Sequence, residues 1–128
     1  MKPVVSLIVL VALAASCGRG ASSPPPARSA LIDALCTVRD DLRRGDATDA
    51  RRMYYDHAHD PLHALAGRVA DHDRSSAGRL LEAHQIVEAD LSAGRAGGAS
   101  AGHVDTLVHR AISATAVVGE PEPKGCGR

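Results

Sequence analysis

Apolar residues recur along most of the chain at the three- and four-residue spacing of amphipathic helices. In residues 28–44 this stripe contains Leu31, Leu35, Val38 and Leu42, and Gly45 follows as a helix terminator. Residues 47–70, 74–92 and 101–118 show the same periodicity, without the strict alternation or the Asn-Gly and Asp-Gly turns of β-hairpins. The pattern therefore predicts an all-α domain of four helices.

The links between these helices are short or consist of small residues. Residues 71–73 form a turn in which Asp73 can cap the following helix, and residues 93–100 contain only Gly, Ala, Ser and one Arg. Such links favour an antiparallel, up-down-up-down four-helix bundle. Within residues 47–70, Tyr55 is expected on the inner face, and Pro61 removes one backbone hydrogen bond and predicts a kink.

The N-terminus is typical of an export signal. After Lys2, residues 4–15 are apolar except for Ser6. This run of about 12 residues suits a signal segment and is shorter than the roughly 20 residues that span a bilayer. The run ends in Leu13-Ala14-Ala15-Ser16-Cys17, with small residues directly before a cysteine.

This ending resembles the lipobox of bacterial lipoproteins. The resemblance covers only the leader, residues 1–16, and implies cleavage before Cys17 and a diacylglyceryl group on its sulfur. The chain is then expected at the outer face of a bacterial cell membrane, anchored by that lipid. Two alternatives stay open, because Ala12-Leu13-Ala14 could be an ordinary cleavage site and the segment could remain as an uncleaved anchor.

The stretch after the leader, residues 17–27, has the composition of a tether. Its first half is rich in Gly and Ser, and Pro24-Pro25-Pro26 make the second half stiff and extended. The folded domain is therefore expected to comprise residues 28–128, with residues 119–128 as an extended tail.

The domain has few large side chains for its core. The chain has no Phe or Trp and only two Tyr, so a core of Ala, Leu and Val buries little apolar area per residue. With Cys17 lipidated, Cys36 and Cys126 remain in an oxidising compartment, where a disulfide is the default. Closing a loop of about 90 residues would stabilise the fold by roughly 4.5 kcal/mol. The alternatives are free thiols or half of a metal site.

Charge and motifs argue against two function classes. The chain carries 15 basic and 15 acidic residues, without a basic face or interleaved aromatic residues, so we expect no nucleic-acid partner. No P-loop, nucleophile elbow, HExxH or glycine-rich nucleotide motif occurs, so we expect no enzymatic activity.

Seven histidines are the most distinctive compositional feature. On a helical wheel His84 falls in the core stripe of residues 74–92, with Glu88 about 40° away. A hairpin that turns near residue 72 places His59 and Asp56 opposite them, whereas His63 points further outward. Imidazoles and carboxylates on facing helices are typical of metal sites in bundles, so His59, His84, Glu88 and Asp56 predict a site for zinc, copper or iron.

The same residues also have a purely structural interpretation. His84 could be a neutral core residue bonded to Glu88, which Arg39 would neutralise, and His59 and His63 could form a solvated surface pair. The sequence is therefore compatible with two functions. One is a non-enzymatic binding or structural module that acts on an envelope protein partner, and the other is a transition-metal-binding lipoprotein.

Overall fold

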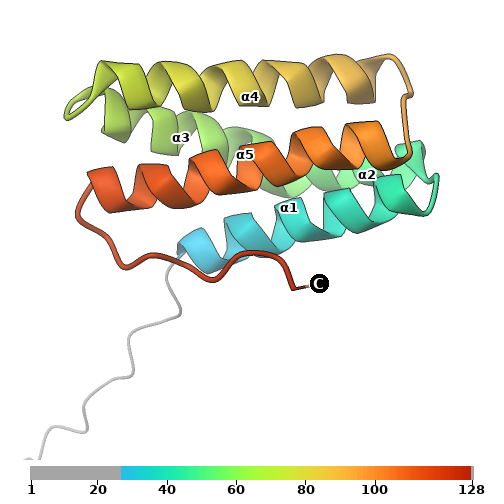
Figure 1. Ribbon diagram of the computed structural model, residues 1–128, viewed down its shortest axis with the longest axis horizontal. Helices are drawn as coiled ribbons and strands as arrows, with labels where there is room; N and C mark the ends of the chain where they lie inside the picture. Colours follow the sequence, from blue (N-terminus) through green and yellow to red (C-terminus); the bar gives the residue numbers. More distant parts are fainter. Residues whose placement is uncertain (1–26, 128) are drawn as a thin grey trace, which may run out of the picture.

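The computed structural model describes residues 27–127, and all regular structure in that range is helical. The elements are α1 (Ala27–Arg43), α2 (Ala47–Met53), the π-helical turn η1 (Tyr54–Ala58), α3 (His59–Ala70), α4 (Arg74–Ser92) and α5 (Gly98–Val117). Because α2, η1 and α3 follow one another without a break, they form one long helix, and the prediction of an all-α four-helix fold is confirmed. Figure 1 shows the chain reversing its direction at each link.

The link after α1 is built by capping groups that the sequence supplies. Gly45 adopts φ 84°, which is easily accessible to glycine. Its N–H bonds to the Leu42 carbonyl at 3.0 Å and the Asp46 N–H to the Asp41 carbonyl at 2.9 Å, the pattern of a Schellman motif. The Asp46 side chain then accepts a hydrogen bond from the Asp49 N–H at 3.0 Å and so caps α2. One short segment thus ends one helix and begins the next.

The turn η1 changes the register of the second helix. Buried residues there follow one another at a spacing of four, in the order Ala50, Tyr54, Ala58 and Leu62. In a regular α-helix, which turns about 100° per residue, each step of four residues moves the side chain about 40° around the helix. Three such steps would move the buried position by about 120°. The His59 N–H bonds to the Tyr54 carbonyl, five residues back, and this wider turn absorbs the drift. Pro61, which has no N–H to donate to the carbonyl four residues earlier, lies three residues after this turn.

Tyr54 is the large aromatic residue of the core as a result. It is fully buried, whereas Tyr55 is 39% exposed, so the prediction that Tyr55 lies in the core is wrong. A wheel with regular 100° steps misses the residue that η1 inserts. Apart from His84, the other large, fully buried side chains are aliphatic: Leu35, Val38, Leu42, Leu62, Leu65, Val69, Leu80, Val87, Leu91 and Leu107.

Asp90 fastens the link between α4 and α5. Its buried carboxylate lies 2.6 Å from His103 Nδ1 and accepts a hydrogen bond from Arg95 Nε at 2.8 Å. Burial acts to raise the pKa of this carboxyl, but hydrogen bonds from His103, Arg95 and Ser100 outweigh it and hold the pKa below its usual range. These contacts order the first turn of α5, which begins at Gly98, earlier than the expected residue 101.

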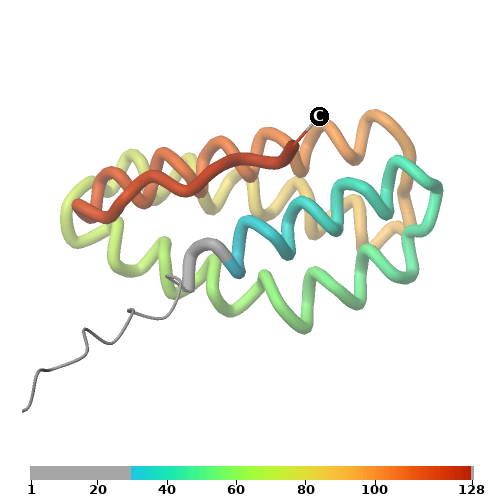
Figure 2. Tube along the Cα trace, turned by 90° about the horizontal axis from the view of Figure 1, so that it is seen from below, coloured from blue at the N-terminus to red at the C-terminus, as the bar shows by residue number. Residues whose placement is uncertain are grey.

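The C-terminal tail is fastened to α1. The predicted disulfide between Cys36 and Cys126 is present, with the two Cα atoms 5.4 Å apart and a sequence separation of 90. The tail runs back from the end of α5 beside the bundle (Figures 1 and 2). The buried side chain of Arg39 donates to the Gly127 carbonyl at 3.1 Å and pairs with Asp105. Arg39 therefore binds the tail and Asp105. The structural interpretation, in which it would neutralise Glu88, is wrong on this point.

Candidate metal centre

Three histidines from two facing helices come together beside η1. His59 and His63 lie one turn apart on α3, and His84 lies near the middle of α4. The ring centroids of His59 and His63 lie 4.8 Å apart, and the ring of His84 lies 4.7 Å from His63 and 5.4 Å from His59. One ligand nitrogen of each ring lies within 4.8 Å of the others. We call these three residues the histidine cluster.

The members of the cluster differ in depth. The His84 side chain is 2% exposed, that of His59 is 29% exposed, and His63 is exposed. The exposure of each histidine follows from its place on its helix. His84 falls within the buried stripe of α4, whereas His59 and His63 lie on the flank of α3. The cluster thus extends from the protein core to the surface.

Glu88 lies between the two deeper histidines. It follows His84 by one helical turn, and its Oε2 is 3.3 Å from His84 Nδ1. Its Oε1 is 3.2 Å from His59 Nε2, across the gap between α3 and α4. On its other side, His59 Nδ1 lies 2.9 Å from the Asp60 carboxylate. His59 therefore has a carboxylate oxygen beside each of its two ring nitrogens.

Two buried polar atoms beside the cluster have no hydrogen-bond partner. They are His84 Nε2 and the hydroxyl of Tyr54, whose ring centroid lies 5.8 Å from that of His84. An unsatisfied buried polar group costs about 1–3 kcal/mol, so such atoms are uncommon in native structures. The free lone pair of a neutral imidazole is also what a metal ion requires.

Burial keeps both of these side chains uncharged. Desolvation lowers the pKa of the His84 imidazole, and the neighbouring His63 and His59 add to this, against the opposite effect of Glu88. Desolvation also raises the pKa of the Tyr54 hydroxyl, and the charge of Glu88 adds to that shift. His84 therefore presents a neutral ring at physiological pH.

The structure brings together three of the four residues that the sequence suggested as ligands, namely His59, His84 and Glu88. Asp56 is exposed and, like Glu88, lies outside the group of ligand atoms within 4.8 Å of one another, which only His59, His63 and His84 form among the described residues. It belongs to η1, where the regular wheel fails. His63 takes its place in the group, although the wheel directed it outward.

The signal for His63 was its spacing of four residues from His59. Side chains on an α-helix lean toward its N-terminus. The ring of His63 therefore reaches back over the turn that carries His59.

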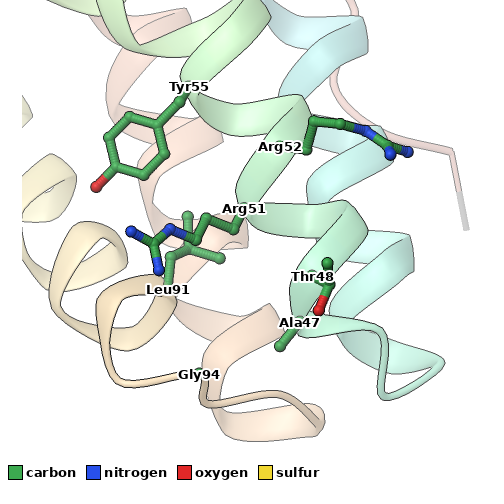
Figure 3. A pocket seen from close by; sticks show the side chains of 7 residues that line it. All are labelled: Ala47, Thr48, Arg51, Arg52, Tyr55, Leu91 and Gly94. Atoms are coloured by element: carbon green, nitrogen blue, oxygen red, sulfur yellow. The ribbon is translucent and has the colours of Figure 1, made fainter.

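A shallow depression between the start of the second long helix and the end of α4 does not include the cluster. Its volume is about 400 Å³, and Thr48, Arg51, Tyr55 and Leu91 contribute to its lining. In Figure 3 Arg51 and Tyr55 extend to the same side of their helix, and the Arg51 Cζ lies 5.9 Å from the centre of the Tyr55 ring. This stacking occupies the guanidinium group, and none of the cluster histidines lines the depression.

The leader, Cys17 and most of the tether lie outside the described residues. Within residues 27–127, no helix is long and apolar enough to cross a membrane. No protein-family model, curated protein or solved structure matches the chain.

Proposed function

We propose that this protein is an exported, lipid-anchored helical bundle that binds a divalent transition-metal ion between α3 and α4. His59, His63 and His84 would supply imidazole nitrogens, and Glu88 a carboxylate oxygen. Two observations about the same residues carry this proposal: one ligand nitrogen from each of the three histidines lies within 4.8 Å of the others, and the deepest of them, His84, has a buried ring nitrogen without a hydrogen-bond partner. A fold gains nothing from leaving that nitrogen unsatisfied, whereas a metal site needs it.

The spacing of Glu88 and its neighbours suits shared coordination. Two donors on a tetrahedral ion, each about 2.1 Å from it, are separated by about 3.4 Å. Glu88 Oε1 lies 3.2 Å from His59 Nε2, close to that value, and Oε2 lies 3.3 Å from His84 Nδ1, which leaves His84 Nε2 available for the ion. The imidazole nitrogens, within 4.8 Å of one another, must close by roughly 1.4 Å to reach it. Rotation of the exposed His63 and half-exposed His59 can supply that movement.

The donor set limits the choice of metal. Imidazole with carboxylate suits zinc, copper(II) and iron(II), whereas thiolates would favour copper(I) or clusters. Cys36 and Cys126 are joined to each other and offer no thiolate. For such donors affinity among these ions is greatest for copper(II).

The cellular location in this proposal rests on the leader. The apolar run that ends in Ala15-Ser16-Cys17 supports export and lipidation of Cys17. The proposal includes no catalytic step. A broader role as a binding or structural module with an envelope protein partner remains a prediction from the sequence.

Calorimetric titration of zinc, copper(II) and iron(II) into the tag-free exported protein tests the metal site. We expect one ion per chain with a Kd tighter than about 10 µM, or about −7 kcal/mol. His84→Ala should abolish this binding, and His109→Ala, at an exposed position on α5, should leave it intact. Binding weaker than that limit, or equal loss in both variants, would contradict the proposal and leave His84 and Glu88 as a structural pair.

A further inference from the structure

The histidine cluster has one buried side and one exposed side. His84 is held within the core, with its ring against that of Tyr54. His63 is exposed. An ion held by the cluster would therefore be shielded from solvent on the side of His84 and accessible to solvent on the side of His63.

Carboxylates orient the two inner histidines. Glu88 Oε2 lies against His84 Nδ1, and the Asp60 carboxylate lies against His59 Nδ1. Carboxylates in such positions fix the ring orientation of a metal ligand and strengthen its donor nitrogen. Among the described residues, the ion-pair contacts of the cluster give His63 no such carboxylate. His63 is thus the least constrained of the three potential ligands.

We propose that the bound ion is transferred to a second molecule with nitrogen or oxygen donors by stepwise ligand exchange on the exposed side. This inference rests on the proposed metal-binding function. The incoming donor forms a bond to the ion as the bond to His63 breaks. The released imidazole nitrogen of His63 keeps its lone pair and accepts a hydrogen bond from water. The oxidation state of the ion does not change. His59 and Glu88 are displaced next, and His84 releases the ion last.

The two sides of the cluster explain this order. A donor from solvent cannot reach the ion from the side of His84 without opening the bundle, because that ring is almost fully buried. It can reach the ion beside His63, whose side chain can rotate away at little packing cost. A site that exchanges its ion in this way suits metal acquisition or delivery, whereas an enclosed structural site would retain its ion.

The rate of zinc release to a chelator tests the order of exchange. The zinc-loaded full chain is mixed with increasing excesses of 4-(2-pyridylazo)resorcinol, and the coloured zinc complex is followed by stopped-flow absorbance. We expect the release rate to rise in proportion to chelator concentration, because the chelator attacks the bound ion. His63→Ala should accelerate release at least about tenfold, the effect that loss of a group supporting a metal ligand already produces.

His57→Ala is the matched control, since His57 is exposed on η1 and lies outside the cluster. Its release rate should equal that of the wild type. Tight zinc binding with a release rate independent of chelator concentration would overturn the exchange proposal alone, because the ion would then leave only after the site opens. A failure of zinc to bind would overturn the proposed function and this inference with it.

Discussion

Replacement of His84 by leucine separates a functional histidine from a structural one. Leucine has a similar volume and restores a continuous apolar stripe on α4. The change removes the unpartnered Nε2 atom, whose burial costs about 1–3 kcal/mol. It also removes the contact of Nδ1 with Glu88, but Glu88 keeps its contact with His59 at 3.2 Å.

We therefore expect His84→Leu to stabilise the metal-free protein by about 1 kcal/mol. For a domain of about 100 residues this raises the melting temperature by roughly 4–8 °C. The wild type should gain stability when metal is present, by about 2.7 kcal/mol at a concentration 100 times its Kd. His84→Leu should therefore have the higher melting temperature in metal-free buffer, and the wild type should have the higher one in buffer that contains zinc.

Thermal unfolding of both proteins, with and without zinc, measures this reversal. His109→Leu is the control at an exposed position, where a substitution changes stability by no more than about 0.5 kcal/mol. Destabilisation of the metal-free protein by His84→Leu would show instead that the buried imidazole makes favourable interactions, and would contradict a net cost of its burial. The same melting temperature for the wild type with and without zinc would contradict the predicted stabilisation of the wild type by bound metal.

Three further predictions concern the rest of the chain. Replacing Cys36 and Cys126 with serine should lower the free energy of unfolding by about 2–4.5 kcal/mol, and an unchanged urea midpoint would contradict this. Asp90 has a lowered pKa, so its stabilisation should be present above pH 3.8 and be lost as pH falls through its lower folded-state pKa. Urea unfolding between pH 2 and 6 should show a flatter acid limb for Asp90→Asn, and an unchanged slope would count against the contacts of Asp90. Cys17→Ser should move the protein from the membrane pellet to the supernatant, whereas full retention in membranes would favour an uncleaved anchor.

The helices and their ends could be predicted because local signals agree with the packing. The leucine stripe of α1, the terminator Gly45 and the cap Asp73 all lie where the sequence placed them. The disulfide was predictable by elimination, since Cys36 and Cys126 are the pair that is left if Cys17 carries the lipid that the leader predicts. The beginning of α5 was missed because its first turn depends on Asp90, a residue of another helix.

The candidate site was predictable only in part, because of one inserted residue. Regular helical geometry placed His84 and Glu88 correctly, since α4 is continuous from Arg74 to Ser92. It failed for Tyr55 and Asp56, which lie in η1. The spacing of four between buried small and aromatic residues around Pro61 was the available signal for that turn.

The most direct test of the proposed site is an NMR titration of the imidazole nitrogens with zinc, which is diamagnetic. The chain has seven histidines, and long-range proton–nitrogen correlation spectra report the state of each ring. With one equivalent of zinc, we expect the ligand nitrogens of His59, His63 and His84 to shift while the other four histidines stay unchanged. Equal small shifts at all seven rings, or an unchanged His84, would contradict the account.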